Sequence, residues 1–115
     1  MNSGLSATDP VRFAAMFAAL GTESRLRIVR LLLAAHPGGM IVSDIQTELG
    51  IPASTLSHHL DKLRQQELVA VERKGTFLWY RANTATLQEL LRFLYAECCT
   101  RSNAVEPAEF VQICK

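Results

Sequence analysis

The chain has 115 residues and a formal net charge of +1, with 49% hydrophobic and 20% charged residues. This composition is typical of one globular domain. No apolar run approaches the ~20 residues that span a bilayer, and Met1–Leu5 lack the basic and apolar regions of a secretory signal. Three cysteines are an odd number for a disulfide framework, so we expect a reducing, cytoplasmic setting.

Two helices are predicted at the start of the chain. Thr8–Pro10 combines capping side chains with an early proline, and Gly21 is expected to end the first helix. Thr22 is positioned to cap the second helix, which Pro37–Gly39 stops. The expected apolar positions are Phe13, Phe17 and Leu20 in the first helix, and Leu26, Val29, Leu32 and Leu33 in the second.

A helix-turn-helix is predicted next. Ser43 and Gln46 have the spacing of a capping box, which would open a short helix that ends at Gly50. Ile51–Ala53 then forms a short turn, and a further helix runs from about residue 53 to residue 66. Its leucines share one face at helical spacing: Leu56, Leu60 and Leu63.

A hairpin and a last helix complete the predicted fold. Apolar residues begin a strand at Leu68, Arg73–Thr76 forms a turn, and Phe77–Arg81 forms an aromatic second strand. Asn83–Thr86 offers several caps, with Thr86 and Glu89 as a second capping box. The stripe of the last helix is expected to comprise Leu87, Leu90, Leu91, Leu94 and Cys98.

This element order predicts a fold that is mainly α with a small β-hairpin, a winged helix-turn-helix. We expect residues 1–101 to form the DNA-binding and dimerisation domain and residues 102–115 to form a C-terminal tail. The sequence shows no Cys/His/Asp arrangement, glycine-rich phosphate loop or carboxylate pair that favours an enzyme. A winged-helix module that binds only proteins stays open as an alternative.

The polar face of the helix that follows the turn is the candidate DNA-reading surface. Hydroxyls near a helix N-terminus suit phosphates and base edges, and a glutamine can read adenine. Basic residues at a hairpin tip would reach the backbone or the minor groove. The alternative is a face that only contacts solvent. The predicted DNA-binding residues are Ser54, Thr55, Ser57, His58, Lys62, Gln65, Arg73 and Lys74.

Two residues of the same helix are not expected to contact DNA. The direction of His59 falls close to the leucine stripe, so we expect it to be packed or hydrogen-bonded within the domain. Asp61 would repel phosphate, and we interpret it as a residue for solubility or orientation.

Three segments resemble the ArsR/SmtB family of metal-sensing repressors. Residues 20–32 are similar to the second-helix signature of the family, residues 54–63 to its recognition helix, and residues 68–81 to its wing. The resemblance covers roughly residues 10–100. It implies a homodimer built from the first and last helices, which binds an inverted-repeat operator and releases it when an inducer binds. Two-fold symmetry predicts half-sites about one helical turn apart.

Several sensor sites of the family lack their ligands in this chain. A Cys-Val-Cys arsenic site would align with Ile41–Ser43, where both thiols are missing. A zinc site on the last helix needs an Asp-x-His pair, and residues 87–101 contain neither residue type. The redox and persulfide sensors pair a cysteine near the second helix with one on the last helix, and no cysteine precedes Cys98.

The chain instead resembles family members that sense trivalent arsenic through a vicinal cysteine pair at the end of the last helix. Adjacent α-carbons lie ~3.8 Å apart, so Cys98 and Cys99 can reach one soft ion. Cys114 is the candidate third ligand. Three thiolates would suit arsenite or antimonite, and two would suit a monomethylated arsenical. No resident cofactor is expected.

Other interpretations of these cysteines stay open. Cys98 would be a packing residue and Cys99 incidental if neither binds an ion, and Cys114 lies near a terminus, where disorder is common. A repressor of the same fold would also use such thiols to sense cadmium, lead or thiol oxidation. The sequence does not decide whether a site forms within one chain or across a dimer.

Overall fold

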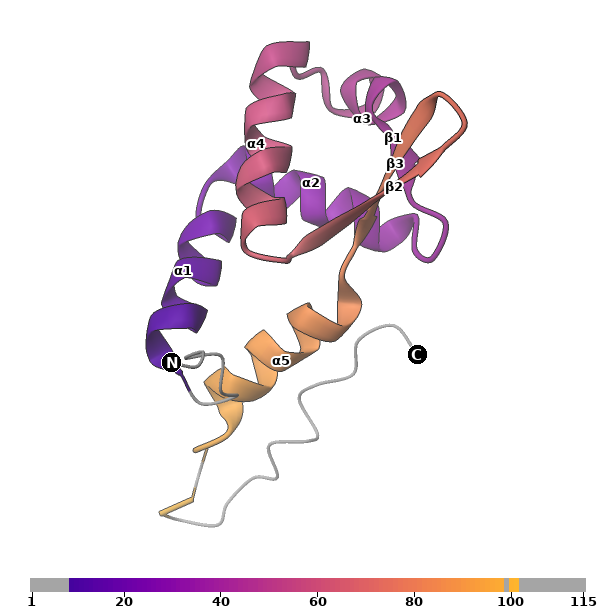
Figure 1. Ribbon diagram of the computed structural model, residues 1–115. Coiled ribbons are helices and arrows are strands. Elements are labelled where there is room, and N and C mark those ends of the chain that lie inside the picture. The colour runs from indigo at the N-terminus through magenta and orange to yellow at the C-terminus, as the bar shows by residue number, and fades with distance from the viewer. Residues whose placement is uncertain (1–8, 99, 102–115) are drawn as a thin grey trace.

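The computed structural model describes residues 9–98, 100 and 101. Along the chain it has the following helices and strands: α1 (Pro10–Leu20), α2 (Glu23–Ala34), β1 (Met40–Ile41), α3 (Val42–Leu49), α4 (Ala53–Gln65), β2 (Val69–Lys74), β3 (Phe77–Ala82) and α5 (Thr84–Tyr95). This arrangement is a winged helix-turn-helix, as predicted (Figure 1). The predicted tail, residues 102–115, lies outside the described residues, so the boundary at residue 101 stays a prediction.

The first two helices begin where the sequence predicts. The Asp9 carboxylate accepts a hydrogen bond from the Val11 amide at 3.0 Å, and Pro10 occupies the first helical position. The Thr22 hydroxyl accepts from the Arg25 amide at 3.2 Å, which satisfies one of the amides at the start of α2.

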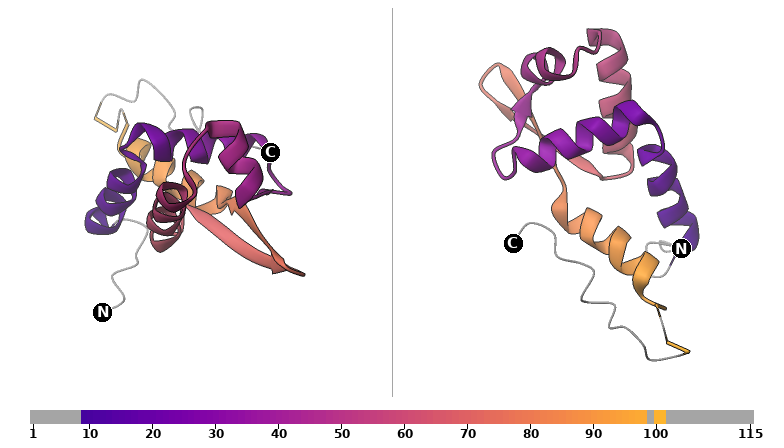
Figure 2. Two further views of the ribbon diagram at one scale, coloured as in Figure 1. Left: turned by 90° about the horizontal axis from the view of Figure 1, so that it is seen from above. Right: turned by 180° about the vertical axis from the view of Figure 1, so that it is seen from behind.

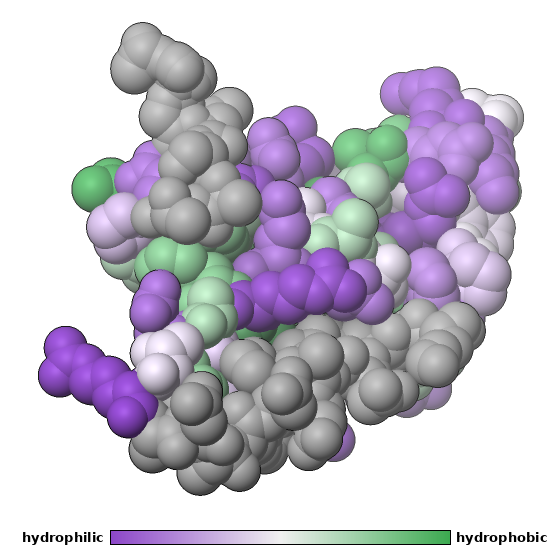
Figure 3. All heavy atoms as spheres, turned by 90° about the horizontal axis from the view of Figure 1, so that it is seen from below, coloured by the Kyte–Doolittle hydropathy of each residue, from purple (hydrophilic) through white to green (hydrophobic). Residues whose placement is uncertain are grey.

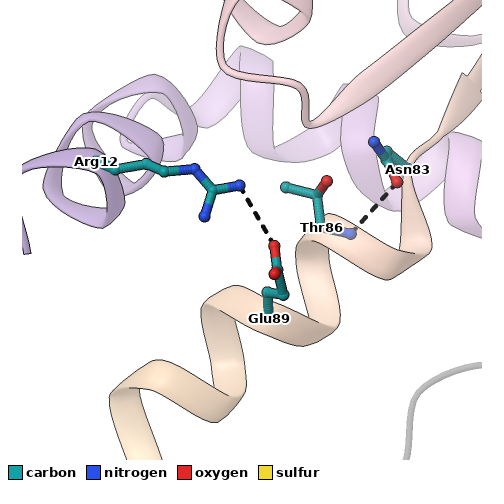
Figure 4. A network of polar contacts seen from close by, with 4 residues as sticks. All are labelled: Arg12, Asn83, Thr86 and Glu89. Atoms are coloured by element: carbon teal, nitrogen blue, oxygen red, sulfur yellow. Dashed lines mark hydrogen bonds and ion pairs between the residues drawn. The ribbon is translucent and has the colours of Figure 1, made fainter. Parts of the chain in front are cut away.

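The two predicted capping boxes are wrong. Helix α3 begins at Val42 after Ile41, without a side-chain cap, so Ser43 already lies inside its first turn. The start moves earlier because Met40 and Ile41 are held in a strand. In α5 the cap is Asn83, whose side-chain oxygen accepts from the Thr86 amide at 3.3 Å (Figure 4).

The sheet contains a short strand that the sequence does not predict. Its order is β1-β3-β2, and both pairings are antiparallel, with Met40 opposite Tyr80. Gly39 precedes β1 at φ 83°, and a Cβ at this position would overlap the Tyr80 carbonyl. The hairpin turn is also tighter than predicted, because Arg73 and Lys74 belong to β2.

One hydrophobic core joins the helices to the sheet. Leu56, Leu60 and Leu63 are fully buried, as the leucine stripe of α4 predicts. Leu26 was expected in the core of α2, but it is 48% exposed, and Ile28 is buried instead. In α1 the predicted Phe13 is buried, together with Met16 and Ala19, while the predicted Phe17 is 37% exposed. The complete set of buried apolar residues is Phe13, Met16, Ala19, Ile28, Val29, Leu32, Ile45, Ile51, Leu56, Leu60, Leu63, Leu68, Val69, Tyr80, Ala82, Leu87 and Leu90.

Helix α5 packs against α1 at the end of the molecule away from the wing tip (Figures 1 and 2). The Phe13 and Phe93 rings stack with their centroids 4.3 Å apart. An Arg12 guanidinium nitrogen lies 3.3 Å from the Glu89 carboxylate (Figure 4). These two contacts join α5 to the first helix.

The stripe of α5 is shorter than predicted. Leu87 and Leu90 are buried, but Leu94 is 58% exposed. The helix ends at Tyr95, so Cys98 lies in the following turn, where its amide donates to the Tyr95 carbonyl at 2.8 Å. None of the helices in the described part of the chain has the length and apolar character needed to cross a membrane.

Candidate nucleic-acid interface

The outer face of α4 is exposed along its whole length. All six predicted DNA-binding residues of this helix are exposed, whereas its three leucines are buried. The turn before α4 depends on Gly50, which ends α3 in the left-handed region at φ 67°. The role of the exposed residues in DNA binding stays a prediction. They are Ser54, Thr55, Ser57, His58, Lys62 and Gln65.

The N-terminus of α4 has the features of an anion-binding helix end. Pro52 precedes the helix without a side-chain cap, and the first turn contains no acidic residue. The first amides are therefore available to a ligand, at the positive end of the helix dipole. A phosphate is a suitable partner for this arrangement.

Asp61 is partly neutralised by a neighbour on its own helix. Its carboxylate lies 3.4 Å from an Arg64 guanidinium nitrogen, and both side chains are at least half exposed. Such a pair contributes about 0–1 kcal/mol to stability. Its effect here is to reduce the repulsion that Asp61 would exert on phosphate.

The wing tip lies at the same end of the molecule as the start of α4, with α3 between them (Figures 1 and 2). Arg73 and Lys74 are exposed at the end of β2. The Lys74 ammonium lies 5.5 Å from the centre of the Trp79 ring. Phe77, which follows the turn, is 54% exposed, and sequence periodicity did not single it out as a surface residue.

His59 connects α4 to α2, and its predicted packing within the domain is confirmed. An Arg25 guanidinium nitrogen (Nη1) lies 3.3 Å from Nδ1 of His59, and the Arg25 Nε–H donates to the Ala19 carbonyl. Burial, the Arg25 charge and the nearby His58 lower the pKa of His59 below 6.5. The ring is therefore neutral near pH 7 and accepts from the guanidinium. The sequence alone did not indicate Arg25, which is 34 positions away.

The predicted sensor residues are described only in part. Cys98 is half-buried beside the end of α5. Cys99 and Cys114 lie outside the described residues, so the three-thiol site stays a prediction. Within residues 9–98, 100 and 101, no three His, Cys, Asp or Glu side chains are grouped to hold a metal ion.

Comparisons with known proteins define the class. A family model for a helix-turn-helix domain matches residues 20–72. The chain is 34% identical over 79 residues to the transcriptional repressor SdpR of Bacillus subtilis strain 168, covering 69% of this chain and 84% of SdpR. It is 33% identical over 75 residues to an arsenical resistance operon repressor of Staphylococcus aureus, covering 65% of this chain and 69% of that repressor.

Solved structures agree with the fold. An ArsR-like transcriptional regulator from Rhodococcus sp. RHA1 has a TM-score of 0.66 at 25% identity, covering 83% of this chain and 96% of that one. The homodimeric winged helix-turn-helix DNA-binding domain of Mb0332 from Mycobacterium bovis has a TM-score of 0.60 at 28% identity. This similarity covers 84% of this chain and 89% of that domain. This chain belongs to the ArsR family of winged-helix transcriptional regulators. That family is a class of DNA-binding regulators rather than of enzymes.

Proposed function

We propose that this protein is a cytoplasmic, arsenical-responsive transcriptional repressor. It binds operator DNA as a homodimer and dissociates when a trivalent arsenical binds cysteine thiolates. The observation that carries the DNA-binding part is the exposed polar face of α4, whose uncapped N-terminus lies at the same end of the molecule as the basic wing tip. Hydroxyl, amide and cationic groups at one end of a small domain match the major-groove and backbone contacts of a winged helix.

The inducer site in this proposal consists of Cys98 and Cys99, with Cys114 as a third ligand for inorganic arsenite or antimonite. Trivalent arsenicals prefer thiolates and need no histidine or carboxylate. The end of the regular α-helix at Tyr95 supports this assignment, because Cys98 lies beyond it in a turn, where its amide donates to the Tyr95 carbonyl. The similarity to a repressor of an arsenical resistance operon is a second support.

The homodimer in this proposal uses α1 and α5. Val11 of α1 is 78% exposed and Leu94 of α5 is 58% exposed, so two helices that pack against each other both present apolar side chains to solvent. Viewed from this end of the molecule, apolar side chains appear among hydrophilic ones (Figure 3). The relative Mb0332 is a homodimer. A two-fold dimer would read an inverted repeat.

Release would follow a chain of contacts from α5 to α4. An ion at the end of α5 would shift this helix, which is stacked on α1 through Phe93 and Phe13. The end of α1 is hydrogen-bonded to Arg25, and Arg25 contacts His59 on α4. A shift of the recognition helix or of the dimer geometry would then weaken DNA binding. A coupling free energy of ~1–3 kcal/mol is typical of allosteric proteins.

The test is fluorescence anisotropy of the purified protein on DNA from its own upstream region. Arsenite, monomethylarsenite, antimonite, cadmium, lead and zinc are titrated separately under reducing conditions. We expect an arsenical to raise the Kd for DNA by about tenfold or more. Because serine does not replace a thiolate, Cys98→Ser and Cys99→Ser should retain DNA affinity and lose release.

Cys114→Ser separates the two arsenical classes. Loss of the response to arsenite, with the response to monomethylarsenite retained, would indicate a three-thiolate site for the inorganic ion. Release by cadmium or lead alone would assign a different inducer to the same fold. A full arsenical response in Cys98→Ser would show that the site assignment is wrong.

A further inference from the structure

A hollow of about 290 Å³ is lined by residues from the end of α1, the start of α2 and the end of α4. These three helix ends lie close together in the fold (Figure 1). Three alanines of α1 form one wall, so no large side chain fills the space. The polar groups come from Arg25, Lys62, Gln65 and Gln66. The hollow therefore combines two cations with two amides, and no acidic residue lines it.

Arg25 is held in a fixed orientation at this hollow. Its Nε–H donates to the Ala19 carbonyl, and its Nη1 contacts Nδ1 of His59 at 3.3 Å. The Ala19 carbonyl carries no charge, and the His59 ring is neutral near pH 7 because its pKa is lowered. The guanidinium charge is therefore not neutralised by a carboxylate, and among the described residues Nη2 of Arg25 has no partner.

Lys62 is the second cation of the hollow, and nearby acidic groups do not neutralise it. The carboxylate of Asp61, the residue before Lys62, lies against Arg64 at 3.4 Å. In the described part of the chain, no ion pair includes Lys62. A planar guanidinium edge and a mobile ammonium beside two amide donors form a suitable set of ligands for a tetrahedral oxyanion.

We propose that this hollow binds a phosphate-type oxyanion, with Arg25 and Lys62 as its charged ligands and the two glutamine amides as further donors. Lys62 and Gln65 also belong to the exposed face of α4, so the bound group would lie at the edge of the predicted DNA surface. The oxyanion would be a backbone phosphate of the operator or a free phosphorylated small molecule. Only the assignment to operator DNA rests on the proposed function.

The first experiment tests the hollow without DNA. Inorganic phosphate replaces chloride at constant ionic strength, and ¹⁵N–¹H spectra follow the Arg25 Nε–H and the amides of residues 62 and 65. We expect saturable shifts at these positions, and Lys62→Gln should weaken phosphate binding by about tenfold. Arg27→Gln is the matched control, because it removes the same charge from an exposed position of α2 that neither lines the hollow nor forms an ion pair with a described residue.

Shifts that do not saturate, or equal weakening of phosphate binding by Lys62→Gln and Arg27→Gln, would overturn the proposal, because the anion would then sense only the general charge of the domain. Phosphate binding that is lost in Lys62→Gln but kept in Arg27→Gln supports the proposal. Lys62 is exposed, so its replacement should not unfold the domain.

The second experiment distinguishes the two sources of the oxyanion. Operator affinity is measured with phosphate and chloride at equal ionic strength. If a backbone phosphate occupies the hollow, phosphate competes with operator in the wild type but not in Lys62→Gln, and the salt slope of this variant falls by about 0.9. Phosphate that binds without competing identifies a free anion as the ligand. If the protein binds no DNA, the proposed function is refuted. The phosphate titration would still show whether the hollow binds an oxyanion.

Discussion

The protonation state of one residue, His59, decides whether α4 makes a neutral or a charged contact with the rest of the domain. In the folded state, Nδ1 of His59 accepts a hydrogen bond from Arg25. Burial and the two neighbouring basic groups lower the pKa of His59. In the unfolded chain its pKa returns to about 6.5. Between the lowered pKa and 6.5 the unfolded state therefore binds more protons than the folded state.

This difference predicts a stability that depends on pH. The contribution of neutral His59 is fully present above pH 6.5 and is lost as the pH falls from 6.5 through the lowered pKa. Urea unfolding at pH 7.5 and at lower values should show this decline in the wild type and a flatter profile in His59→Gln. His36→Gln is the control, since His36 is exposed and is not one of the groups that lower the pKa of His59, and it should keep the decline. An unchanged decline in His59→Gln would contradict the role of this residue.

Helices and strands differ in how far local sequence determines them. The leucine stripe of α4 and the caps Asp9 and Thr22 were predictable because each depends on residues within one or two turns. The start of α3 was not, since it follows from the pairing of Met40 with Tyr80, which is 40 positions later in the chain. A two-residue strand is also too short to show an alternating pattern.

In the candidate site, too, features that depend on local sequence were predictable, and features that depend on contacts between helices were not. The exposed face of α4 follows from helical periodicity, which places polar residues opposite the leucines. The Arg25 contacts and the hollow beside Lys62 depend on how three helices meet, and no periodicity within one helix reports that. Leu26 was assigned to the core because it fits the spacing of Val29 and Leu33, but it is 48% exposed and Ile28 is buried in its place.

The contact between α5 and α1 is the element-scale step through which an inducer signal would pass. Phe93→Leu removes the ring stack with Phe13 but retains most of the apolar volume, so we expect a loss of about 1 kcal/mol in the free energy of unfolding. We also expect the ratio of operator Kd values with and without arsenical to fall severalfold. Urea unfolding and fluorescence anisotropy measure the two effects.

Glu89→Gln is the control for this prediction. It removes only the partly exposed ion pair with Arg12, which contributes about 0–1 kcal/mol, and it leaves the ring stack in place. Release should then stay close to that of the wild type. If Phe93→Leu responds to the arsenical as fully as Glu89→Gln does, the stacked rings do not transmit the signal.

The whole molecule exposes apolar residues at the end opposite the wing tip, and a second copy would bury them. Val11 of α1 and Leu94 of α5 are the most exposed large apolar residues in the described part of the chain. Each copy would present the same patch in a two-fold dimer, so one substitution removes an apolar contact twice. The recognition helices of the two copies would then be held at a fixed separation for the two operator half-sites.

Leu94→Glu should therefore raise the dimer dissociation constant by about 30-fold or more, which corresponds to ~2 kcal/mol. Its effect on the folded monomer should be small, because the side chain is 58% exposed. Leu26→Glu is the matched control: it introduces the same charge at a 48% exposed leucine of α2, outside the predicted interface. Sedimentation equilibrium separates the two variants, and operator affinity should fall with dimerisation in Leu94→Glu alone. A dimer that survives Leu94→Glu, or one that Leu26→Glu disrupts equally, would place the interface on other helices.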